Sequence, residues 1–165
     1  MANILTSAFL KELKDEAAAS RKCLERVPEN LFKWKPHEKS MEMGYLALIV
    51  AEVPRWISTA IEVGDINFGT FKHEPAKNAA DLVKEFDVNM KHAEEVLQKT
   101  SDEDLDGMFT LGSGDKVFMK MSKRDMASSS INHMVHHRGQ LTVYLRLNNI
   151  PVPSLYGPSA DESHF

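Results

Sequence analysis

The sequence predicts an all-α protein built as a four-helix bundle, with a short β-hairpin before the last helix. Four stretches space their apolar residues by three and four, as amphipathic helices do. Only one short region is typical of strands, so no second class of core element competes with the helices. A length of 165 residues with 42% hydrophobic side chains predicts a single domain, residues 1–165, with a core of its own.

The first predicted helix begins near Leu5, where Phe9 and Leu13 continue a spacing of four, and it ends near Val27 before Pro28. Residues 28–40 are then expected to form a connection.

The second predicted helix runs from about Glu42 to Glu62, and Gly64 follows its end. Pro54 lies inside it and removes one backbone hydrogen bond, which predicts a kink. Residues 64–78 are expected to be a loop. A third helix is predicted over 78–99 from its inward seam of Val83, Phe86, Met90, Ala93 and Leu97.

Two short strands are predicted over 109–111 and 116–119, around a glycine-containing turn. Because an isolated hairpin is only marginally stable, it is expected to rest on the helices. Ser122, followed three residues later by an acid, predicts the cap of a fourth helix that ends near Leu147. The remaining residues, 151–165, are expected to be extended.

Composition excludes several classes of function. With 20 basic and 24 acidic residues, the net charge of −4 argues against a nucleic-acid partner, which would need a basic surface. No apolar run approaches the roughly 20 residues of a membrane span, and the apolar N-terminus lacks the basic start of a signal peptide. Cys23 is the single cysteine, which favours a reducing compartment. A cytoplasmic protein without a membrane partner is therefore expected.

The most informative motif is a histidine pair in the fourth predicted helix. His133 and His137 are four residues apart, so they share one helix face and could bind one transition-metal ion. Met134 stands where the metal-binding helix of zinc proteases carries glutamate, so a protease is not indicated. The alternative is a hydrogen-bonded pair in a polar seam of the bundle.

The sequence from Asn132 to Leu147, with the Pro151-Val152-Pro153 and Tyr156-Gly157-Pro158 segments that follow, resembles the DinB family. Residues 46–57 also resemble the second helix of that family, and the resemblance covers essentially the whole chain. It implies a DinB-like four-helix bundle, a nickel or zinc ion held by three histidines, and a homodimer. Relatives include transferases that use a low-molecular-weight thiol such as bacillithiol or mycothiol, and a maleylpyruvate isomerase. The family name refers to DNA-damage-inducible expression.

By this resemblance, His133 and His137 match two of the three metal ligands, and Ile49 stands where the first ligand would be. Isoleucine cannot bind a metal, so the expected site is incomplete. Glu52, one turn beyond Ile49, could complete a His-His-Glu set. The alternative for Glu52 is an ion pair with a histidine or with Arg55.

Four residues are expected to line a pocket beside the histidine pair: Ile49, Trp56, His136 and Tyr144. For Trp56 and Tyr144 the alternative is a place in the core as packed aromatic side chains. Three further histidines have no informative spacing and are expected at the surface: His37, His73 and His92.

Two classes of function remain open at this level. The first is a metal-dependent enzyme of unassigned reaction, of the hydrolase or thiol-dependent transferase kind, with a nickel or zinc ion at His133 and His137. The second is a non-catalytic ligand-binding or structural dimeric bundle that has lost the metal, and Ile49 motivates it.

Overall fold

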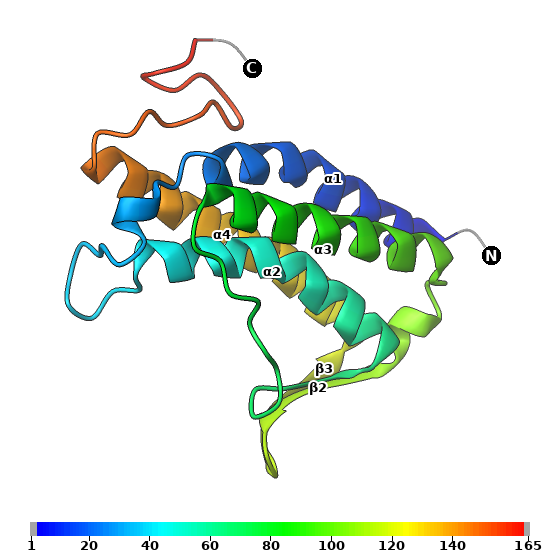
Figure 1. The fold of residues 1–165 in the computed structure, drawn as a ribbon. Coiled ribbons are helices and arrows are strands. Elements are labelled where there is room, and N and C mark those ends of the chain that lie inside the picture. Colours follow the sequence, from blue (N-terminus) through cyan, green and yellow to red (C-terminus); the bar gives the residue numbers. More distant parts are fainter. Residues whose placement is uncertain (1–2, 164–165) are drawn as a thin grey trace.

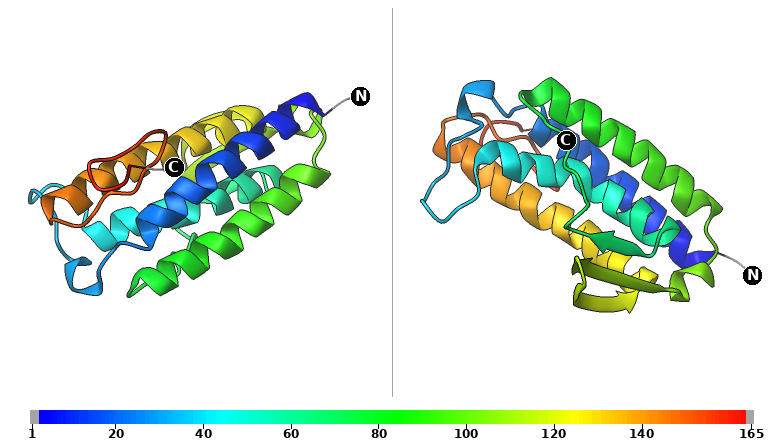
Figure 2. Two further views of the ribbon diagram at one scale, coloured as in Figure 1. Left: turned by 90° about the horizontal axis from the view of Figure 1, so that it is seen from above. Right: turned by 60° about the horizontal axis from the view of Figure 1, so that its bottom comes forward.

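In a computed structural model, which describes residues 3–163, four long helices pack side by side (Figure 1). They are α1 (Ile4–Leu24), α2 (Met43–Glu62), α3 (Ala79–Lys99) and α4 (Lys123–Leu147). α1 and α4 run in one direction and α2 and α3 in the other, so the bundle is not a simple up-down-up-down arrangement (Figure 2). The predicted fold class is confirmed, although the expected domain, 1–165, includes four terminal residues outside the described range.

The helix boundaries follow from local chemistry. The Ser122 side chain accepts a hydrogen bond from the backbone N–H of Asp125 at the start of α4, as the sequence predicted. Asn78 caps α3 in the same way. After α1, Pro28 precedes a short 3-10 turn, η1 (Glu29–Leu31), and a second turn, η2 (Asp104–Asp106), follows α3.

A three-stranded sheet lies against one end of the bundle (Figure 1). Strands β2 (Met108–Ser113) and β3 (Lys116–Ser122) form the predicted antiparallel hairpin. β1 (Asp65–Asn67) pairs in parallel with β2. The prediction of a plain loop over 64–78 was therefore wrong at these three residues, because so short a strand leaves no readable alternation and its partner is distant in sequence.

Apolar side chains join the sheet to the bundle. Ile66 of β1 and Phe109 of β2 are buried with Ala60 and Met126 in a small cluster of their own. The larger core lies between the four helices. None of the helices within residues 3–163 has the length and apolar character needed to cross a membrane.

Candidate functional site

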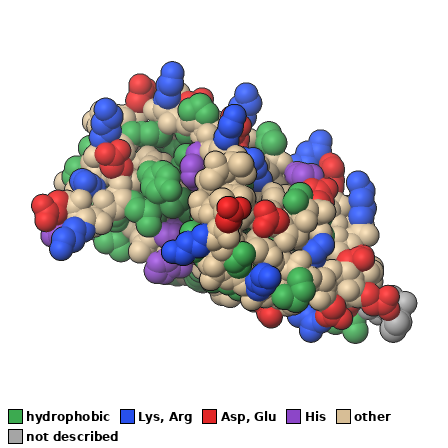
Figure 3. Space-filling view, turned by 90° about the horizontal axis from the view of Figure 1, so that it is seen from below, with side chains coloured by type: hydrophobic (Ala, Val, Ile, Leu, Met, Phe, Trp, Pro, Cys, Tyr) green, Lys and Arg blue, Asp and Glu red, His purple; other side chains and the backbone are tan. Residues whose placement is uncertain are grey.

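An apolar cavity of about 730 Å³ lies between α2, α4, the sheet and the segment that follows β1. The view from below shows apolar side chains gathered around a hollow, with histidines at its edge (Figure 3). The volume is within the range of small-molecule sites in proteins. Thirteen side chains line it: Met41, Tyr45, Ile49, Trp56, Phe68, His73, Leu111, Met119, Met126, Ser129, Ser130, His133 and His137.

His133 and His137 meet in the wall of this cavity. The Nε2 atoms of the two rings are 2.8 Å apart, and the ring centroids are 4.3 Å apart. The sequence placed the two residues on one helix face, and α4 brings them together as that spacing requires. The Trp56 ring packs on His133 with centroids 5.3 Å apart, so α2 holds the pair from the opposite side.

Gln140 fixes the orientation of the His137 ring. The Gln140 Oε1 atom is 2.7 Å from His137 Nδ1, and because an amide oxygen can only accept, Nδ1 carries the hydrogen. His137 Nε2 therefore presents its lone pair toward His133. A hydrogen bond of this kind behind a histidine is what orients metal-binding imidazoles in proteins.

Burial shifts the pKa of both rings toward the neutral form. Burial, followed by the neighbouring His137 and His136, lowers the pKa of His133 from its ordinary value to about 4. Burial also lowers the pKa of His137, although the hydrogen bond to Gln140 opposes this. Neutral imidazole is the form that binds transition metals.

The pair fits one metal ion as a chelate of two nitrogens. Two ring nitrogens that each lie roughly 2.05 Å from one ion are roughly 2.9 Å apart at the right angle of octahedral coordination and roughly 3.3 Å apart at the tetrahedral angle of zinc, so the 2.8 Å found here is closer to the octahedral arrangement. A third protein ligand is not assembled, because within residues 3–163 no three side chains of histidine, cysteine, aspartate or glutamate are grouped for metal binding. The donor set is thus a half-site rather than a three-ligand centre.

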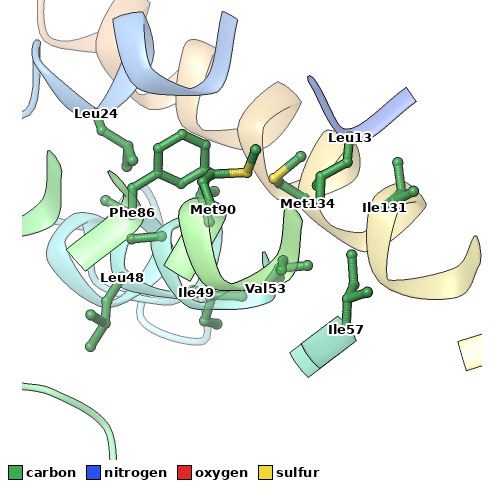
Figure 4. Close-up of a cluster of buried hydrophobic side chains, with 14 of the residues drawn as sticks. Leu13, Leu24, Leu48, Ile49, Val53, Ile57, Phe86, Met90, Ile131 and Met134 are labelled. Carbon is green, nitrogen blue, oxygen red and sulfur yellow. The ribbon is translucent and has the colours of Figure 1, made fainter. Parts of the chain in front are cut away.

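Ile49 occupies the wall beside the pair. Its side chain is 7% exposed and belongs to the main core cluster together with Leu48 and Val53 of α2, as Figure 4 shows. It also lines the cavity. An apolar group thus fills the position where the resemblance would have a first ligand.

Glu52 contacts a different partner. Its Oε2 atom accepts a hydrogen bond from Nδ1 of His73 at 2.6 Å, and its Oε1 atom accepts one from the backbone N–H of Glu74 at 3.3 Å. The Glu52 side chain is fully buried, and that burial raises the pKa of its carboxyl, whereas His73 opposes the rise. A histidine as the partner of Glu52 was one of the predicted alternatives, and the structure shows this contact with His73.

Of the other residues expected to line the pocket, one lines the cavity and two do not. Trp56 lines the cavity, and its Nε1–H has no hydrogen-bond partner within the described residues. His136 is exposed, with its ring centroid 5.1 Å from that of His137. Tyr144 packs edge-on against Trp34, and its hydroxyl donates to the Met41 carbonyl. Neither His136 nor Tyr144 is among the lining residues of the cavity.

Sequence reasoning missed His73. It placed this residue at the surface with His37 and His92, and the ring is 39% exposed, but it also lines the cavity and lies edge-on to Tyr45 and Phe71. No periodic pattern could have shown the contact with Glu52, because the two residues are 21 apart and His73 lies outside the helices and strands.

Comparison with known proteins assigns this chain to a family. The sequence profile described as "DinB family" matches residues 1–164. The chain belongs to the DinB family. The resemblance in the last helix and around Pro54 is thereby confirmed.

Two solved DinB-like proteins share the fold. One, from Bacillus subtilis, is 18% identical with a TM-score of 0.71, and the match covers 95% of this chain and 99% of that one. The other, from Bacillus cereus ATCC 10987, is 24% identical with the same TM-score, and the match covers 91% and 97%.

Among curated proteins, the uncharacterized protein YrdA of Bacillus subtilis strain 168 is 50% identical over 32 residues. That segment is 19% of each protein, so the match covers about a fifth of the length of this relative.

Proposed function

We propose that this DinB protein binds a divalent transition metal, nickel or zinc, through His133 and His137, and an apolar small molecule in the adjoining cavity. The observation that carries the proposal is the pair of Nε2 atoms, 2.8 Å apart, in the wall of an apolar cavity of about 730 Å³. The ring orientation supports it, because Gln140 leaves His137 Nε2 free to donate its lone pair.

The residues of the chain have separate parts in this proposal. His133 and His137 hold the ion as neutral imidazoles, and Ile49 and Met126 exclude water from one side of it. Trp56 packs on His133 and restricts the movement of that ring. When bound, the ion would supply Lewis acidity, which lowers the pKa of a coordinated water or thiol. A thiol-dependent transfer, the reaction class of some relatives, is compatible with such a site.

Equilibrium dialysis with Ni²⁺ and with Zn²⁺, followed by elemental analysis, tests the proposal. One equivalent is expected in the parent protein, and His133→Ala and His137→Ala are each expected to lower the affinity at least about tenfold. His136→Ala is the matched control, because His136 is on the same helix but exposed, and it is expected to bind as the parent does. Retention of full affinity in both alanine variants would contradict the proposal.

The second candidate is a ligand-binding bundle without a metal. It is favoured by Ile49 in the place of the first ligand and by the short Nε2–Nε2 distance, which also fits a direct hydrogen bond from one ring to the other. Under this reading Ni²⁺ and Zn²⁺ fail to bind, whereas a neutral apolar dye such as Nile red still enters the cavity. The two measurements together separate the candidates.

Three further properties are proposed from the resemblance and the composition. The resemblance supports a homodimer and a low-molecular-weight thiol as co-substrate. The lone Cys23, buried in α1, supports a reducing, cytoplasmic location. Sedimentation equilibrium would test the dimer.

A further inference from the structure

We propose that Glu52 and His73 form a second, metal-independent catalytic pair that hydrolyses uncharged apolar esters in the same cavity. The pair is separate from His133 and His137, and it combines a helix residue with a residue of the segment after β1. The inference goes beyond the proposed metal site and does not depend on it.

The geometry gives His73 one oriented nitrogen and one free nitrogen. Nδ1 donates to Glu52 Oε2 at 2.6 Å, so Nε2 on the far side of the ring carries the lone pair. Within residues 3–163, no hydrogen-bond partner occupies that Nε2. A carboxylate that holds an imidazole in this way fixes its tautomer and stabilises the imidazolium once it forms.

The surroundings hold this pair rigidly. Glu52 is fully buried on α2, and its second oxygen accepts the backbone N–H of Glu74, so the carboxylate cannot turn away without losing both bonds. Tyr45 and Phe71 flank the His73 ring at centroid distances of 5.8 and 5.6 Å. The ring remains 39% exposed, which leaves water access to it.

The lining selects for an uncharged substrate. Among the lining residues there is no lysine or arginine to balance a ligand carboxylate or phosphate. Most of them are apolar or aromatic, which favours an aliphatic or aromatic acyl chain. An anionic ester would leave an uncompensated charge in apolar surroundings.

The chemical step uses water as its co-reactant. His73 Nε2 accepts a proton from a water molecule while the water oxygen bonds to the ester carbonyl carbon. The C–O bond to the alcohol then breaks, and the imidazolium returns the proton to the departing alkoxide. The products are a carboxylic acid and an alcohol, and His73 ends in its starting form.

The test is hydrolysis of p-nitrophenyl butyrate in the presence of EDTA. The parent protein is expected to turn over repeatedly, and His73→Gln is expected to lower kcat/KM by about 100-fold. Glu52→Gln is expected to lower it by about tenfold, because the imidazole loses its orienting anion. His92→Gln is the matched control, since His92 pairs with Glu62 at 3.3 Å outside the cavity, and it is expected to leave the rate unchanged.

Chemical rescue separates catalysis from a structural role. Imidazole added to His73→Ala is expected to restore part of the lost rate, which a purely structural histidine would not show. The proposal is overturned if His73→Gln stays within twofold of the parent, if imidazole restores nothing, or if the parent is no faster than the heat-denatured chain. Because EDTA removes metal, failure of the metal proposal leaves this outcome unaffected.

Discussion

Two side-chain pairs place histidines in the wall of one cavity, and they differ in where the partners come from. His133 and His137 lie one turn apart on α4, Gln140 of the same helix contacts His137, and burial lowers the pKa of both rings. His73 comes from the segment after β1 and pairs with a buried carboxylate on α2. In the proposals above, the first pair would offer two nitrogens to an ion, whereas the second would offer one nitrogen backed by a carboxylate.

Under the two proposals, one cavity would serve two chemistries. Two imidazoles without a nearby carboxylate suit metal binding, because neutral nitrogens need no counter-charge. An imidazole with a buried carboxylate suits proton transfer, because the carboxylate stabilises the charged ring. Substitution of a single residue can therefore affect one pair and leave the other unchanged.

The largest effect is expected from Ile49→His. A third imidazole beside the pair would complete a three-histidine set, so the affinity for Ni²⁺ is expected to rise on the order of 100-fold. Isothermal titration calorimetry measures the change. Ile49→Leu is the control and should bind as the parent does; an unchanged affinity in Ile49→His would mean that Ile49 does not face the ion.

The next effect concerns stability at the other pair. His73→Ala removes the partner of a fully buried carboxylate and is expected to lower the free energy of unfolding at pH 7 by about 2 kcal/mol, a value reduced for the partial exposure of His73. Urea denaturation measures it. The exposed pair gives the control: His92→Ala should change the stability by less than about 0.5 kcal/mol. Equal losses in the two variants would contradict the account.

A smaller effect is expected at Gln140. Gln140→Ala leaves both ring nitrogens in place but releases the orientation of His137, so Ni²⁺ affinity is expected to fall about tenfold. The p-nitrophenyl butyrate rate is expected to stay the same, because Gln140 does not contact His73. A fall in both the Ni²⁺ affinity and the p-nitrophenyl butyrate rate would show that the variant disturbs the fold rather than one pair.

The smallest effect concerns pH. Because the folded pKa of His133 is about 4, below its ordinary value of 6.5, the unfolded chain binds the proton more tightly. This contribution to stability is complete above about pH 6.5 and is lost as the pH falls toward 4, by about 1 kcal/mol for a partly buried ring. Urea midpoints at pH 7 and pH 4.5 should differ less in His133→Gln than in the parent. An identical pH dependence in both would contradict the neutral state of His133.

The helices and the histidine pair of α4 could be predicted because their signals are local. Apolar spacing, the Ser122 cap and the four-residue interval between His133 and His137 each depend on neighbours within about one turn. For the same reason, the predicted boundaries of α2 and α3 lie within about one residue of the boundaries that the structure shows.

The remaining features depend on contacts between distant residues. β1 exists because it pairs with β2, more than forty residues later, and three residues carry no alternation to read. His73 reaches Glu52 only because the segment after β1 returns along α2. The sequence named a histidine as one alternative partner for Glu52, but which histidine could be found only from the fold.

The central claim is that one ion is bound by both Nε2 atoms of the α4 pair. Anomalous diffraction from a crystal soaked in NiCl₂ tests it most directly. The account predicts a single strong peak about 2.0–2.1 Å from Nε2 of both His133 and His137, on the cavity side of α4. No peak there, or one at the exposed His136 instead, would contradict it.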